Sequence, residues 1–231
     1  MTDRGTDRNA DDSHEQRVEA PLIVLVAVGL QVLLASVSID RGWTTLGIPG
    51  WAWLIGVVPE LVLILALTLP GSRRRLERSD HRREVSIALV AVIGVVNLFS
   101  LAILIGSLIK AQETHGVELL LKGLSIWGTN VIAFGLLFWE LDGGGPDARR
   151  SDSGLDRDFQ FPQTENPQLV SPGWQPQLID YVYISFTNSI AFSPTDAMPL
   201  SRRCKLLMLN GSAISAVTVL LVAARAVNIL N

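Results

Sequence analysis

Residues 85–109 read VSIALVAVIGVVNLFSLAILIGSLI, a run of 25 residues without a charged side chain. A helix needs about 20 predominantly apolar residues to cross the hydrocarbon core of a bilayer, which is roughly 30 Å thick. A helix on the surface of a soluble domain keeps a polar face, whereas this run is apolar on all sides. The stretch therefore predicts a transmembrane helix.

Four further apolar runs have the length of a span, namely Pro21–Ile39, Trp51–Leu69, Leu119–Trp139 and Leu206–Leu230. Charged residues make up only 18% of the chain, against about 25% in soluble domains. We predict an all-α integral membrane helical bundle with five full spans. Residues 178–195 add a short helix that either re-enters the membrane or spans it as a sixth helix.

The charges between the runs indicate orientation and domain organisation. Residues 72–84 hold six arginines, whereas segments 40–50 and 110–116 hold only Arg41 and Lys110. Because short cytoplasmic loops are rich in Lys and Arg, we predict a multi-pass protein of the bacterial plasma membrane with a cytoplasmic N-terminus. Residues 1–20 predict a disordered cytoplasmic tail, 21–141 a four-span bundle, 142–177 a polar loop, and 178–231 a final unit of helix, turn and terminal span.

The sequence does not show the residue patterns typical of metal-binding proteins, of enzymes or of nucleic-acid-binding domains. The single cysteine, Cys204, and three scattered histidines form no recognisable metal set. Neither a nucleophile with its base nor a glycine-rich phosphate loop is evident, and the charge pattern is not that of a nucleic-acid-binding domain. We therefore expect a protein that is not an enzyme and that uses neither a cofactor nor nucleic acid.

The segment IDYVYISFTNSIAFSPTDAMP, residues 179–199, carries the most specific pattern. It resembles the pore module of the potassium-channel superfamily, in which a short pore helix leads into a filter, a proline and an inner helix. The resemblance covers about the last fifty residues, and it aligns Asp196 and Pro199 with the Asp and Pro that follow the family's filter. It implies a pore-like loop and a homo-oligomer, because one such module cannot enclose a pore.

The filter itself departs from the family pattern. This chain has Ala191, Phe192, Ser193, Pro194 and Thr195 where the family has Thr-Val-Gly-Tyr-Gly. A potassium filter needs its glycines for backbone angles closed to other residues, and proline restricts φ further. The loop is therefore predicted not to select potassium.

Residues 193–196 also allow a plainer interpretation. Ser193 could cap a helix that starts at Pro194, with Asp196 completing a capping box, so that the segment only turns the chain. The combined pattern FWELDGGGP and AFSPTDAMP is similar to that of an uncharacterised bacterial family of multi-spanning membrane proteins, a resemblance that implies no activity.

Polar residues within the apolar runs are the remaining candidates, because ionisable groups at depth are costly and often functional. Glu60 follows Pro59 in the middle of the second run and could handle a proton or cation, or could only fix helix packing. Asn97, Asn130 and Gln31 are expected to make interhelical hydrogen bonds.

Charged residues near the ends of the runs complete the candidates. Lys122, close to the end of a span, is expected to reach water. Glu140 and Asp142, at the end of the fourth run, could approach a cation or the pore-like segment, or could be solvated interfacial acids.

Two functions remain open from the sequence. The first is a transport-class protein, channel-like in its last hairpin, with the lipid bilayer, a second copy of the chain and a monovalent cation as partners. The second is a non-transporting membrane scaffold or regulatory subunit.

Overall fold

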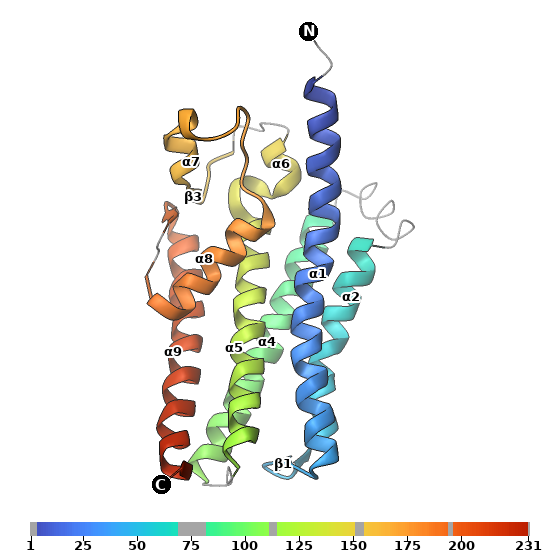
Figure 1. Ribbon diagram of the computed structural model, residues 1–231, viewed down its shortest axis with the longest axis vertical. Helices are drawn as coiled ribbons and strands as arrows, with labels where there is room; N and C mark the ends of the chain where they lie inside the picture. Colours follow the sequence, from blue (N-terminus) through green and yellow to red (C-terminus); the bar gives the residue numbers. More distant parts are fainter. Residues whose placement is uncertain (1–3, 69–81, 111–114, 151–154, 194–195, 231) are drawn as a thin grey trace.

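The computed structural model describes residues 4–68, 82–110, 115–150, 155–193 and 196–230, and shows a bundle of helices aligned along one axis (Figure 1). Four helical segments in this described part are long and apolar enough to cross a membrane: Pro21–Asp40, Glu84–Ile109, Gly116–Gly144 and Arg202–Arg225. They belong to α1 (Arg4–Asp40), α4 (Arg82–Ile109), α5 (Gly116–Leu141) and α9 (Arg202–Leu230). The predicted helical bundle is confirmed.

Helix α5 is the central element of the bundle. It packs against α1, α4, α9 and α8 (Leu178–Ala191), and it is the most buried of the four long segments. Its contact with α9 includes Asn130, whose side-chain amide donates to the Gly211 carbonyl and to Ser215 Oγ, both at 3.0 Å. The interhelical role expected of Asn130 is thus confirmed.

The second predicted span is an interrupted helix. After the hairpin of β1 (Thr44–Thr45) and β2 (Ile48–Pro49), the chain forms the 3₁₀ helix η1 (Gly50–Gly56) and then α2 (Val57–Thr68). Proline lacks an N–H and is tolerated in the first turn of an α-helix, where that donor would be unpaired. Pro59 therefore lies just inside the start of α2, although the sequence places it in the middle of the second apolar run.

Helix α1 begins at Arg4, whereas the sequence predicted disorder for residues 1–20. Extending an existing helix by one residue costs far less than nucleating a new one. The apolar segment from Pro21 onward thus provides a helix that the preceding residues continue. This polar part of α1 extends beyond the bundle at its N-terminal end (Figure 1).

The segment predicted as a polar loop is folded onto one end of the bundle. It contains η2 (Asp142–Gly144), α6 (Pro146–Arg150), β3 (Phe159–Gln160), α7 (Pro162–Glu165) and η3 (Pro167–Leu169). Its aromatic residues Phe159 and Phe161 are buried and stack edge-on against Tyr181 of α8. A small aromatic core therefore fastens this segment to the helices.

Helix α8 does not run the length of the bundle. It crosses obliquely, and the chain after it returns to the end from which it came (Figure 1). There β4 (Met198–Pro199) pairs antiparallel with β3, with Phe159 opposite Pro199 and Gln160 opposite Met198. Because β3 precedes α8 in the chain and β4 follows it, this pairing holds both ends of the segment that contains α8 at the same end of the bundle.

The helix start predicted at Ser193 is wrong. Helix α8 ends at Ala191, and the described residues from Asp196 to Ser201 are not helical. Helix α9 begins at Arg202, and its cap is Ser201, whose Oγ accepts the Cys204 backbone N–H at 3.1 Å. The pairing of β4 with β3 keeps the chain extended up to this cap.

Candidate functional site

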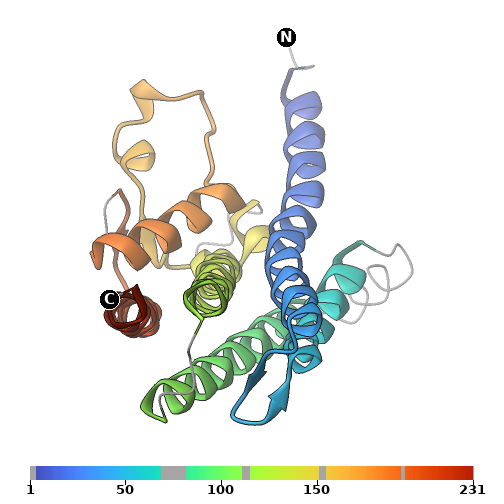
Figure 2. The ribbon, with the colours of Figure 1, turned by 60° about the horizontal axis from the view of Figure 1, so that its bottom comes forward.

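The intramembrane polar residues meet at one level of the bundle. Gln31, Asn97 and Thr129 each lie midway along an apolar segment, on α1, α4 and α5. Glu60 lies in the first turn of α2, directly after the 3₁₀ segment. Viewed along the bundle, these four helices are neighbours (Figure 2). The structure thus brings together three residues that the sequence analysis named separately, Gln31, Glu60 and Asn97.

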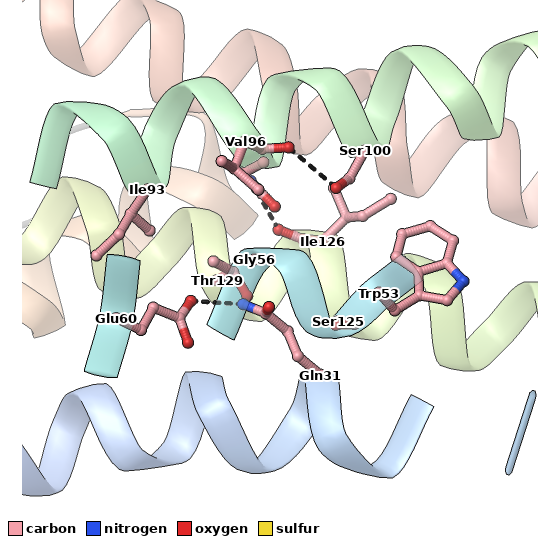
Figure 3. A pocket seen from close by; sticks show the side chains of 11 residues that line it. Gln31, Trp53, Gly56, Glu60, Ile93, Val96, Ser100, Ser125, Ile126 and Thr129 are labelled. Carbon is pink, nitrogen blue, oxygen red and sulfur yellow. Dashed lines mark hydrogen bonds between the residues drawn. The ribbon is translucent and has the colours of Figure 1, made fainter. Parts of the chain in front are cut away.

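Glu60 is fully buried, and only one of its oxygens is bonded. Gln31 Nε2 donates to Glu60 Oε1 at 2.5 Å (Figure 3). Within the described residues, Glu60 Oε2 has no hydrogen-bond partner. An unpaired buried oxygen of this kind costs about 1–3 kcal/mol, so it requires an explanation.

Glu60 lines a small cavity of about 20 Å³. This volume admits one water molecule or an ion of similar size. The polar residues that line it are Gln31, Glu60, Asn97, Ser100, Ser125 and Thr129. Thr129 Oγ1 is likewise buried without a partner among the described residues. Glu60 and Thr129, on different helices, therefore both line this cavity, and each has one unpaired side-chain oxygen.

Two other polar side chains that line the cavity, Asn97 and Ser100, are held in place by hydrogen bonds to backbone carbonyls. Asn97 Nδ2 donates to the Ile126 carbonyl at 3.0 Å, and Ser100 Oγ donates to the Val96 carbonyl at 3.0 Å. The interhelical bonds expected of Gln31 and Asn97 are both confirmed. Among the residues that line the cavity, Glu60 alone carries an ionisable group of the carboxyl or amine kind.

Gly56, the last residue of η1, leaves space for the Gln31 side chain. A Cβ at this position would overlap the Gln31 amide oxygen and lie 3.3 Å from Val96 Cγ1. We expect Gly56→Ala to displace the amide from Glu60 and to lower the free energy of unfolding by about 1–3 kcal/mol, measured by denaturation in detergent micelles. Gly94→Ala is the matched control, because a Cβ there meets nothing within 4 Å. Equal stability of the two variants would contradict this packing.

The two interfacial acids are buried rather than solvated. Glu140 Oε1 accepts a hydrogen bond from Ser86 Oγ of α4 at 2.7 Å. Asp142 Oδ1 accepts the backbone N–H groups of Asp158 and Phe159 at 2.7 and 3.1 Å, and its Oδ2 accepts the Tyr181 hydroxyl at 2.7 Å. Asp142 therefore links the end of α5 to β3 and to the helix that leads to the pore-like segment.

Arginines surround this acid. Arg149 is buried, donates to the carbonyls of Trp139 and Asp142 at 2.7 and 2.6 Å, and lies over the Tyr181 ring. Burial lowers the pKa of the Arg149 guanidinium, and the negative charge of Asp142 opposes that shift. The next acid, Asp158, binds Arg203 at the start of α9. These hydrogen bonds and ion pairs hold α5, the segment around β3, α8 and α9 together at this end of the bundle. We call this group the clasp; its members are Asp142, Arg149, Asp158, Tyr181 and Arg203.

Lys122 occupies a different environment from the one expected. Its side chain is fully buried, and its Nζ lies 2.5 Å from Glu118 Oε1, one turn earlier on α5. The prediction that Lys122 reaches water is therefore wrong. Burial of an ammonium group is tolerated here because a carboxylate lies within hydrogen-bonding distance.

The pore-like loop lies away from the cavity. Ala191 ends α8, Phe192 adopts a left-handed backbone with φ of 54°, and Ser193 is exposed. The carboxylate of Asp196 accepts the Tyr183 hydroxyl, and both residues are exposed. Pro194 and Thr195 lie outside the described residues. The cavity at Glu60 is lined by η1, α1, α2, α4 and α5, and none of the described residues of the loop lines it.

Sequence reasoning missed Gly56, Ser125 and Thr129. Small and hydroxyl residues are common at helix contacts in membranes, so their presence alone is a weak signal. The spacing of Ser125 and Thr129, four residues apart on the helix that also carries Asn130, was the available clue.

Comparison with protein-family models, with curated proteins and with solved structures finds no match to this chain.

Proposed function

We propose that the chain is a transport-class integral membrane protein in which Glu60 binds and releases a proton or a monovalent cation at the middle of the bilayer. The observation that carries this proposal is the unpaired Oε2 of Glu60, a residue that lines a cavity the size of one water molecule. An ionisable residue at this depth is retained at a cost, and such residues mark ion and proton pathways in membrane proteins.

Charge balance supports a monovalent species. A single carboxylate is neutralised by one proton or one monovalent cation, whereas a divalent ion would leave a net positive charge in an apolar environment. Neutral oxygens from Thr129 and Ser125 are available to complete the shell of a small ion. The proposal therefore keeps both ligands expected for Glu60 from the sequence, the proton and a monovalent cation.

The interrupted second span also supports a transport role. Transporters bind their ions near the bilayer midplane, where helices break and expose backbone groups and helix ends. Here the backbone changes from the 3₁₀ helix η1 to the α-helix α2 at Val57, within one turn of Glu60.

The proposed topology has five spans, counting η1 with α2 as one, and a re-entrant α8. It is supported by the placement of the N-terminal part of α1 and of the described residues of segment 142–177 at one end of the bundle, where α2 also ends and α4 begins (Figure 1). In the sequence, residues 72–84 between these two helix ends hold six arginines. The positive-inside rule makes this end cytoplasmic. The proposed location is the bacterial plasma membrane.

Proton movement across vesicles tests the function. Purified protein is reconstituted in liposomes with an internal pH dye, a pH gradient is imposed with valinomycin and potassium present, and the rate of dye response is recorded with and without sodium. We expect Glu60→Gln to reduce the rate to that of protein-free liposomes, because the amide keeps the shape of the side chain but cannot bind a proton.

The control is Glu165→Gln, which makes the same chemical change at an exposed glutamate of α7 and should retain the wild-type rate. If Glu60→Gln also retains that rate, or if wild-type protein moves neither protons nor sodium, the scaffold alternative is correct. In that case the Gln31–Glu60 bond only fixes the packing of α1 against α2.

A further inference from the structure

One face of α5 carries buried polar residues from the cavity to one end of the helix. Glu118, Lys122, Ser125 and Thr129 follow one another at intervals of four, three and four residues, a spacing that places side chains on one helical face. Each of the four is at most 5% exposed. The row begins beside the segment 111–115 and reaches the wall of the cavity at Ser125.

The row ends in an ion pair at a polar end of the bundle. Lys122 Nζ and Glu118 Oε1 are 2.5 Å apart, and His115 Nδ1 lies 3.9 Å from Glu118 Oε2. Ser107 of α4 is fully buried on the facing segment. Among the described residues, the other charged groups at this end are Asp40 and Arg41 at the end of α1, Lys110 after α4 and Arg225 of α9. Lys122 and Glu118 are the two that are buried.

Beyond the cavity in the opposite direction, the same face becomes apolar. The next positions of the α5 row are Ala133 and Leu136, and α4 contributes Val90 and Ile93. All four are at most 3% exposed and belong to the main hydrophobic core. The polar contact of Glu140 with Ser86 lies past this core. Between Glu60 and Glu118 the polar row of α5 runs beside a smaller apolar core of Leu101, Leu104, Leu119 and Ile126, whereas on the other side of Glu60 the seam between α4 and α5 is closed by apolar packing alone.

We propose that the Glu118–Lys122 pair is a second station for the ligand of Glu60, that this ligand is a proton, and that it exchanges with the end of the bundle formed by residues 41–50 and 110–116. This inference rests on the proposed function of Glu60. A metal cation would need space and oxygen ligands along the whole route, whereas a proton crosses by transfer between neighbouring oxygens.

Each proton transfer along this route breaks one O–H bond and forms another. Glu60 loses its proton to a water molecule in the cavity, and an O–H bond forms as the carboxyl O–H bond breaks. Hydroxyls of Thr129 and Ser125 accept a proton on one side and donate one on the other. Glu118 becomes a neutral acid beside the Lys122 ammonium, then releases the proton to the aqueous end and regains its charge.

Sided pH jumps on oriented, reconstituted protein test this inference. The state of the Glu60 carboxyl is followed by infrared difference spectroscopy, with the band assigned by its loss in Glu60→Gln. We expect a faster response to a jump on the side of residues 110–116 than on the side of residues 142–177. The double variant Glu118→Gln/Lys122→Gln removes both charges together and should slow the response at least tenfold.

Two further variants separate transfer from folding. Ser125→Ala removes one hydroxyl of the row and should slow the response, whereas Ser215→Ala, at the α5–α9 contact, should leave it unchanged. Wild-type speed in both the double variant and Ser125→Ala, or a faster response from the 142–177 side, would overturn the route. A change of the Glu60 band on adding sodium at constant pH would overturn the proton assignment. A Glu60 band silent to every jump would overturn the proposed function itself.

Discussion

Replacing Asp142 by Ala is expected to lower the free energy of unfolding by about 3–5 kcal/mol. The substitution leaves two backbone N–H groups and the Tyr181 hydroxyl without their acceptor, and all three are buried by the aromatic core. Each unpaired buried group costs about 1–3 kcal/mol. Arg149 also loses the nearest negative charge that offsets its burial, which adds to the cost.

Denaturation in detergent micelles, followed by tryptophan fluorescence, measures this effect. Asp156→Ala is the control, because Asp156 belongs to the same segment but is exposed, and such surface changes usually stay within about 0.5 kcal/mol. Tyr181→Phe removes only the hydroxyl and should cost about 1–2 kcal/mol. An Asp142→Ala variant as stable as Asp156→Ala would show that the clasp does not hold α5, β3 and α8 together.

Breaking the Lys122–Glu118 pair from either side is expected to cost about 3–5 kcal/mol, because one charge is left buried without its partner. Changing both residues to glutamine should cost less than the sum of the two single changes. The physical reason is that the double variant removes the desolvation penalty together with the attraction.

A double-mutant cycle measures this coupling, with Glu118→Gln, Lys122→Gln and the double variant unfolded under the same conditions. Lys110→Gln, at an exposed lysine near the same end of the bundle, is the control and should have little effect. Additive costs in the cycle would mean that the two charges do not interact and that Lys122 reaches water after all.

The bundle could be predicted from the sequence because hydrophobicity and length alone specify a membrane helix. The form of the second span was less accessible. Pro59 signalled a disturbance, but whether a proline kinks a helix or begins one depends on the preceding residues, which here form a 3₁₀ turn. The start of α9 was misplaced because the Ser-Pro-Thr-Asp pattern of residues 193–196 is a stronger local signal than Ser201, whereas the pairing of β3 with β4 is a long-range interaction.

From the sequence, individual residues of the candidate site could be identified, but not their arrangement. Gln31, Glu60 and Asn97 stand out as polar residues in the middle of apolar runs, and their position in each run gives their depth. Depth does not give rotation about the helix axis or the identity of neighbouring helices, so the hydrogen bond from Gln31 to Glu60 could not be deduced. The aromatic core of Phe159, Phe161 and Trp174 could not be predicted for another reason. Glycine, proline and charged residues dominate the segment in which these residues lie, so it was predicted to be a loop.

The infrared spectrum of the Glu60 carboxyl tests the central claim most directly. In a difference spectrum of wild type against Glu60→Gln, recorded across a pH series in lipid, we predict a carboxylic-acid band that is present at low pH, converts to a carboxylate band as the pH rises, and is absent from the variant. The proposal assigns ligand exchange to this carboxyl because its Oε1 accepts the Gln31 amide and its Oε2 has no partner among the described residues. A Glu60 carboxyl that keeps one state at every pH, with and without sodium, would contradict the account.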